Sequence, residues 1–151
     1  MYKTSEIDIA SIELLDGNIF HVTASTGAEI DLDAAKRLIR TTNKMLPDDV
    51  QFRAGIYDIS QITYIHEDAR TYFATTNDIR GQVAGSAIIS STFLGTTIGN
   101  LFLALSGPRR FPIKMFSSPI RAEHWVRSQL NELNGQDTNA LAAISDHRNV
   151  A

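Results

Sequence analysis

The sequence predicts a single α/β domain built on an open mixed sheet of about five strands. Short apolar runs alternate with amphipathic segments in the order β-β-α-β-α-β-α-β-α. The later alternation favours parallel strands joined by right-handed crossovers, and the opening pair favours one antiparallel edge strand. At 151 residues the chain can bury one sizeable core but not two. We therefore predict one domain over residues 1–133 and a polar tail over residues 134–151.

The first third of the chain predicts a hairpin and a helix. Two apolar runs flank Asp16-Gly17, a pair that is typical of tight turns between antiparallel strands. Asp31 then precedes residues 32–46, whose apolar side chains recur at helical spacing. The chain is thus expected to open with two antiparallel strands followed by an amphipathic helix.

The middle of the chain predicts a buried strand that leads into a helix through a polar corner. Residues 52–59 are apolar at nearly every position, as expected for a central strand. His66, Glu67 and Asp68 then indicate a helix start, because carboxylates in a first turn suit the positive end of the helix dipole. This strand, corner and helix form the most informative stretch of the sequence.

The second half repeats the alternation of strand and helix. Strands are expected over residues 83–89 and 113–116, and helices over residues 93–105 and 118–133. The last helix has a strong start at Ser118-Pro119, because serine caps a helix and proline suits its first position.

The composition excludes several classes of protein. The 17 acidic residues outnumber the 14 basic ones, whereas a nucleic-acid-binding domain needs a basic excess to neutralise phosphates. There is no cysteine, which excludes disulfides, thiolate catalysis and zinc fingers. The N-terminus lacks a secretory signal, so we expect a cytoplasmic protein. Residues 88–105 contain six Ser, Thr or Asn side chains and therefore favour a strand and a buried helix over a membrane span.

The order of five short motifs resembles that of a known fold family. YDIS at residues 57–60, DAR at residues 68–70, IGNLF at residues 98–102 and FPIKMF followed by AEHWV occur in turn. In this order the chain resembles the SpoIIAA-like (STAS) domains, the bacterial anti-sigma-factor antagonists, and most closely an uncharacterised bacterial family of small SpoIIAA-like proteins. The resemblance spans roughly residues 5–133. It implies the open mixed sheet and a regulatory or protein-interaction module that acts without catalysis.

The resemblance also bears on the polar corner. In the antagonists, a serine at the start of this helix is phosphorylated by a partner kinase. The matching position here is Asp68, which carries one negative charge where phosphoserine carries nearly two. The resemblance therefore implies a helix start presented to a protein partner, such as a regulatory kinase or an anti-sigma-like protein, without the phosphoacceptor serine.

Polar side chains also follow two of the predicted strands. Asp58 and Ser60 follow one strand, and Ser90 and Ser91 follow the next. Ligands of open α/β sheets bind at the carboxyl ends of strands, so a small-molecule or lipid carrier with a cleft there is the alternative function. The same side chains suit the capping of the following helices, which is the interpretation we favour. A pocket of a few hundred cubic ångströms would favour the carrier, and a filled interior would favour the interaction module.

The candidate binding residues are these four together with His66, Glu67, Asp68 and Arg70 of the predicted helix start. No nucleophile, base and orienting group can be nominated together, so we expect no catalysis. Three adjacent polar residues fan out around a helix whereas metal ligands must converge, so we expect no metal and no cofactor. Apolar surface left over on the segment at residues 93–105 would favour a homodimer.

Overall fold

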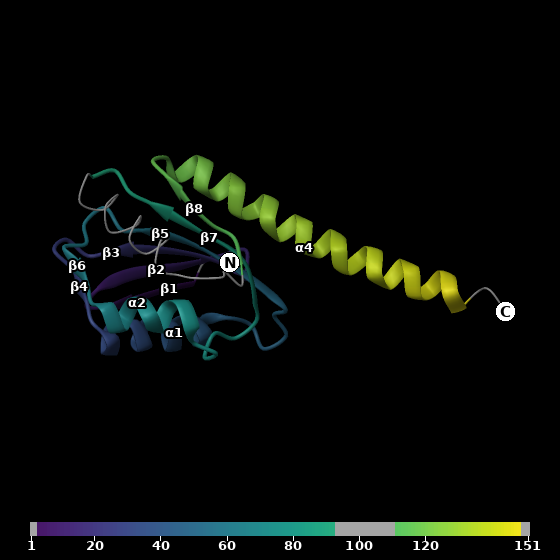
Figure 1. Cartoon of the computed structure of the whole chain (residues 1–151), viewed down its shortest axis with the longest axis horizontal. Coiled ribbons are helices and arrows are strands. Elements are labelled where there is room, and N and C mark those ends of the chain that lie inside the picture. The colour runs from purple at the N-terminus through teal and green to yellow at the C-terminus, as the bar shows by residue number, and fades with distance from the viewer. Residues whose placement is uncertain (1–2, 93–110, 149–151) are drawn as a thin grey trace.

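A six-stranded mixed sheet forms the centre of this computed structural model, which describes residues 3–92 and 111–148, with side chains described up to Gly135 (Figure 1). The strands lie in the order β1-β2-β3-β5-β7-β8. The first three pair antiparallel, and from β3 onward every pairing is parallel. Their bounds are β1 Lys3–Ile7, β2 Ala10–Leu15, β3 Ile19–Ala24, β5 Phe52–Asp58, β7 Gln82–Ile89 and β8 Ile113–Phe116.

Helices cover both faces of the sheet. Figure 1 shows α1 and α2 together on one face and α4 on the other, where α4 runs out beyond the sheet. A separate two-stranded parallel sheet is formed by β4 and β6. The bounds of these elements are α1 Leu32–Met45, α2 Glu67–Thr75, α4 Pro119–Arg148, β4 Glu29–Ile30 and β6 Tyr64–Ile65.

The predicted α/β class and mixed sheet are confirmed, and the strand count needs one correction. The sheet has six strands where about five were expected, because residues 3–7 form the antiparallel edge strand β1. This segment, KTSEI, is mostly polar and lies half-exposed or exposed, so it lacks the apolar alternation that marks a strand. It is held by its ladder of backbone pairs with β2.

Local sequence signals position the first turns as expected. Asp16 and Gly17 both have positive φ, at 52° and 82°, which matches the primed turn that joins twisted antiparallel strands. Asp31 caps α1, since its Oδ1 accepts a hydrogen bond of 2.8 Å from the backbone N–H of Ala34.

The later predicted elements are also observed where the structure describes them. The strands at residues 83–89 and 113–116 correspond to β7 and β8, and α4 begins at Pro119. The helix expected over residues 93–105 lies outside the described residues. Beyond residue 133, where a polar tail was predicted, the backbone of α4 continues as a helix to Arg148.

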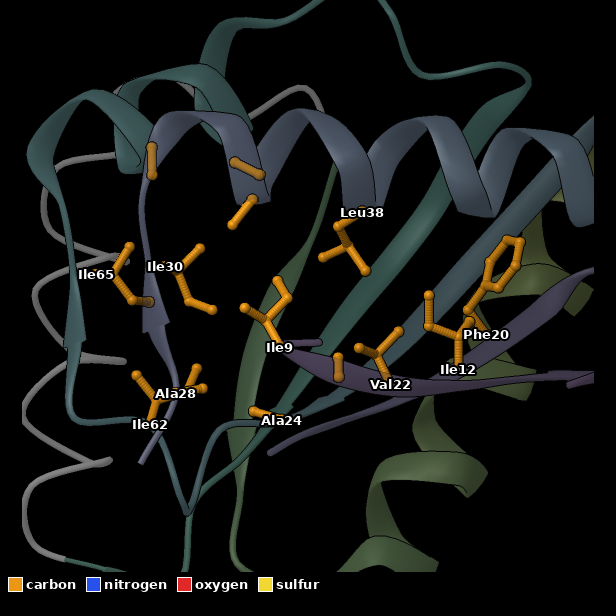
Figure 2. Packing of buried hydrophobic residues seen from close by; sticks show 14 of the residues in the cluster. Ile9, Ile12, Phe20, Val22, Ala24, Ala28, Ile30, Leu38, Ile62 and Ile65 are labelled. Carbon is orange, nitrogen blue, oxygen red and sulfur yellow. The ribbon is translucent and has the colours of Figure 1, made fainter. Parts of the chain in front are cut away.

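The two faces of the sheet bury different side chains. On the α4 face, Ala122, Val126 and Leu130 pack on alternate residues of the central strands. Gly85 allows this close approach, because a Cβ there would lie only 3.2 Å from the Trp125 ring. On the other face, residues of β2 and β3 point toward Leu38 of α1 and toward Ile30 and Ile65 of the small β4–β6 sheet. Figure 2 shows this for Ile12, Phe20, Val22 and Ala24.

Candidate functional site

The predicted binding residues form two groups, the first of which joins the carboxyl ends of β5 and β7. The Asp58 Oδ1 accepts from the backbone N–H of Ser60 at 3.0 Å. The Ser60 Oγ accepts from the backbone N–H of Ser91 at 3.0 Å, and the Thr92 hydroxyl donates to the Ser60 carbonyl. Ser90 is buried, and its hydroxyl donates to the Thr92 carbonyl. These side chains therefore tie the two loops together. None of these bonds caps α2, whose preceding residue His66 makes no side-chain capping bond, whereas the capping interpretation expected these side chains to cap the following helices.

The second group lies at the start of α2. His66 is the residue that precedes the helix, and its Nε2 lies 2.7 Å from the Glu29 carboxylate on β4. Glu67 and Asp68 are exposed in the first turn, as predicted, and the Asp68 Oδ1 accepts from the backbone N–H of Ala69 at 2.8 Å. The Arg70 Nη1 donates to the Ile65 carbonyl at 2.8 Å, so this side chain buttresses the turn.

An exposed aromatic ring completes this second group. Tyr64 is 52% exposed, and its ring packs edge-on against the His66 imidazole with centroids 5.1 Å apart. The parallel pairing of β6 with β4 places Tyr64 opposite Glu29. We call Glu29, Tyr64, His66, Glu67 and Asp68 the acidic corner.

Neither group has the arrangement of a nucleophilic site. A serine nucleophile needs a base within hydrogen-bonding reach. His66 instead contacts Glu29 and Tyr64, while the Ser60 and Ser90 hydroxyls contact groups of the β5 and β7 loops.

A cavity of about 150 Å³, which we call the interior cavity, lies between the sheet and the α1–α2 layer and is partly open, since lining residues such as Tyr57 and Ile113 are half-buried. It extends over the face from β2 to β8, and most of its lining is aliphatic. Figure 2 shows several of these side chains, with Val22 and Ala24 on β3, Ile9 in the turn between β1 and β2, and Ile30, Ile62 and Ile65 across from them. Asp58 lines one end of the cavity, whereas Ser60, Ser90 and Ser91 do not line it.

Two polar residues of β5 enter this apolar lining. Arg53 and Tyr57 alternate with Gly55 along one face of the strand, and all three line the cavity. Arg53 is only 3% exposed. Its guanidinium donates to the Thr42 hydroxyl, the Asn43 side chain and the Arg80 carbonyl, and lies 4.8 Å from the centre of the Phe20 ring.

The prediction of a strand that is apolar at nearly every position did not single out Arg53, Gly55 or Tyr57. Two signals in the sequence could have found them. An arginine inside a run otherwise typical of a buried central strand is unusual, because a buried charge is costly without a partner. A glycine between two large side chains on one strand face indicates that a ring lies over it. Here a Cβ on Gly55 would lie 2.4 Å from the Tyr57 ring and hydroxyl.

The comparisons with known proteins place the chain in a family. The family model described as "Domain of unknown function (DUF7793)" matches residues 12–130. The chain belongs to this family. The matched segment runs from β2 into α4 and so includes the polar corner, the acidic corner and the cavity-lining face of β5. No curated protein matches the chain.

Among solved structures, the DUF7793 chain is similar to an uncharacterised protein of the DUF3478 family with a SpoIIAA-like fold from Shewanella loihica PV-4. The similarity covers 83% of this chain and 95% of that chain, at 12% sequence identity and a TM-score of 0.49. The description of that structure names the fold that the sequence motifs resemble. Among the residues that the structure describes here, no helix is both long and apolar enough to cross a membrane.

Proposed function

We propose that this DUF7793 domain acts without catalysis, as a regulatory protein-interaction module that presents the acidic corner to a partner. The observation that carries this proposal is the exposure of Tyr64. Half of this residue is exposed, although its ring packs against the His66 imidazole. A tyrosine offers a large, rigid contact area with few rotatable bonds, which is why it is common at binding hot spots. The hydrogen bond between His66 and Glu29 holds the imidazole against which the Tyr64 ring packs, before a partner binds.

The charges around Tyr64 favour a basic partner surface. Glu67 and Asp68 are exposed, and Glu29 keeps 63% of its side chain exposed beside His66. Exposed charges at the edge of an interface mainly steer association and select among partners, while a central aromatic residue contributes most of the affinity. We therefore propose that Tyr64 contributes most of the binding affinity, and that the acidic residues of the corner determine which partner binds.

The resemblance to anti-sigma-factor antagonists supports the assignment of the acidic corner as the partner-binding surface. In those antagonists, the start of the matching helix is presented to a partner kinase. In this chain Asp68 holds a permanent charge, and its Oδ1 already contacts the helix start. We propose that partner binding needs no phosphorylation at this position. Replacing Asp68 by alanine should weaken binding and leave the domain folded, which circular dichroism can check.

The experiment is a capture of partners from the cytosol of the host with tagged protein, read out by native mass spectrometry. Tyr64→Ser and Glu67→Gln should reduce the captured partner, whereas the matched changes Ile120→Ser and Asp49→Asn should not. Ile120 is 81% exposed on α4, and Asp49 is an exposed acid outside the corner. The proposal is wrong if all four variants capture the same partner equally, or if only copies of this chain are recovered.

We propose separately that the chain forms a homodimer, on the sequence of the apolar segment at residues 93–105, which lies outside the described residues. Multi-angle light scattering on the purified chain should give twice the mass of one chain. The mass of a single chain at the highest concentration tested would exclude the dimer, and it would leave the partner-binding proposal to be judged on the capture experiment alone.

A further inference from the structure

The guanidinium of Arg53 is buried beside the interior cavity without a carboxylate to neutralise it. Among the residues that the structure describes, no Asp or Glu oxygen lies within 4.0 Å of its nitrogens, and its three hydrogen bonds go to neutral groups. Asp58 lines the same cavity but is five residues along the strand, about 16 Å away. A buried charge without a counter-charge costs several kcal/mol, so this site favours an anion.

Neighbouring groups offset this charge only in part. Thr42 and Asn43 belong to the last turn of α1, whose carbonyl end carries a partial negative charge. However, Arg80 lies at the same helix end, where it donates to the Asn43 and Leu46 carbonyls. Burial lowers the pKa of Arg53, and the charge of Arg80 lowers it further. Arg80 has a carboxylate partner in Asp48, at 3.9 Å, whereas Arg53 has none among the described residues.

Arg53 also has donors to spare. A guanidinium carries five N–H groups. The bonds to the Asn43 side chain and the Arg80 carbonyl use both hydrogens of Nη1, and the bond to the Thr42 hydroxyl uses one of Nη2. The Nε–H and one Nη2–H remain, and free N–H groups of a guanidinium bind carboxylate oxygens strongly.

Tyr57 supplies a third donor in the same cavity. No group among the described residues hydrogen-bonds to its hydroxyl. Because that hydroxyl lies 2.4 Å from the position of a Cβ on Gly55, the ring is folded back along β5 toward Arg53. Burial raises the pKa of Tyr57 and the positive charge of Arg53 opposes this shift, which places the two groups within electrostatic reach of each other.

We infer that the interior cavity binds a small monocarboxylate with an apolar body of about six carbons, its carboxylate held by Arg53 and the Tyr57 hydroxyl. The size follows from the volume of about 150 Å³, since an apolar cavity of about that volume admits one benzene molecule. The aliphatic side chains of Ile9, Val22 and Ile65 would contact the body. The cavity lining and the acidic corner share no residue, so either proposal can fail without the other.

The experiment is an NMR titration of the whole chain with three probes of equal length: hexanoate, 1-hexanol and hexylamine. Hexanoate should bind at least about ten-fold more tightly than 1-hexanol, because a hydrogen bond to a charged group is worth more than one between neutral groups. Hexylamine should not bind, because its ammonium group would meet the buried guanidinium.

Two matched variants test the assignment of the hydroxyl. Tyr57→Phe should fold normally, since the hydroxyl has no partner to lose, and it should weaken hexanoate binding about ten-fold. Tyr72→Phe is the control, because the Tyr72 hydroxyl donates to the Asp78 carboxylate in an exposed position outside the cavity lining. Its hexanoate affinity should equal that of the unmodified chain. The inference is overturned if no hexanoate binds at millimolar concentration, if 1-hexanol binds equally well, or if Tyr57→Phe binds hexanoate as tightly as the unmodified chain.

Discussion

The two faces of the sheet are built for different purposes. The α4 face is filled: Ala54, Ala84 and Ala87 let the helix approach, and Gly85 brings the Trp125 ring against the strand. The α1–α2 face is larger and carries the interior cavity, with a buried guanidinium and a hydroxyl that has no partner among the described residues. A hydrophobic core packs to the density of an organic crystal, so a cavity lined with polar donors costs stability. The α1–α2 face therefore holds both the larger buried cluster and the cavity that we propose as a binding site, whereas the α4 face serves packing.

The difference between the faces predicts that the same Ile→Ala change lowers the free energy of unfolding by different amounts on the two faces. Ile56→Ala on the filled face should lower the free energy of unfolding by about 4 kcal/mol, near the upper end for such changes. Ile30→Ala should cost about 2 kcal/mol, because one side of Ile30 already faces the cavity and has fewer contacts to lose. Urea denaturation measures both values. Equal costs would contradict the difference in packing.

A second prediction concerns the ring that lies over Gly55. Gly55→Ala should destabilise the chain by about 2 kcal/mol, because the new Cβ forces the Tyr57 ring to move. In a Tyr57→Ala background the same change should be neutral or slightly stabilising, since alanine suits a strand better than glycine. A double-mutant cycle on unfolding free energies measures this coupling. Additive effects would show that the ring does not occupy that position.

Adding side-chain volume by an Ala→Val change should stabilise the chain on the cavity face and destabilise it on the α4 face. Ala24→Val places extra methyl groups toward the cavity and should stabilise the chain by about 1 kcal/mol. Ala87→Val, at a fully buried position of the filled face, should destabilise it by about 1 to 3 kcal/mol through overpacking. Thermal unfolding of both variants checks the signs. Stabilisation of Ala87→Val would mean that the α4 face is not filled.

The smallest expected effect is a dependence of stability on alkaline pH. Burial raises the pKa of Tyr57, so on raising the pH the unfolded chain loses this proton first, near pH 10. The stability that Tyr57 contributes is therefore complete below about pH 10 and falls as the pH approaches its folded-state pKa, by at most about 1.4 kcal/mol per pH unit.

The effect of the Tyr57 hydroxyl is isolated by comparing the pH dependence of the unfolding free energy between the unmodified chain and Tyr57→Phe. Above pH 10 the unfolding free energy of Tyr57→Phe should fall less steeply than that of the unmodified chain. Identical slopes would mean that the Tyr57 hydroxyl titrates as it does in water.

Elements encoded by local signals could be predicted from the sequence. The turn at Asp16-Gly17, the cap at Asp31 and the start at Pro119 each depend on residues within one turn, and each occurs where expected. The edge strand β1 could not be predicted, because its stability comes from pairing with β2 and not from an apolar pattern.

The candidate site could be predicted only in part. Asp58, Ser60, Ser90 and Ser91 come together because the carboxyl ends of parallel strands meet, which the sequence implies. Their mutual hydrogen bonds, and the absence of Ser60, Ser90 and Ser91 from the cavity lining, depend on loop geometry. The cavity depends on volumes summed over elements that are far apart in the sequence, from Ile9 to Ile113, so no local pattern reports it.

The most direct test of the difference between the faces is a methyl NMR spectrum of isoleucine-labelled protein with and without hexanoate. Isoleucines occur on both faces, so each face has its own probes. The methyl signals of Ile9, Ile30, Ile65 and Ile88, which line the cavity, should shift on saturation. Those of Ile19, Ile56 and Ile89, on the α4 face, should stay in place. Shifts confined to the α4 face, or no shifts at all, would contradict the assignment of the α1–α2 face as the binding face.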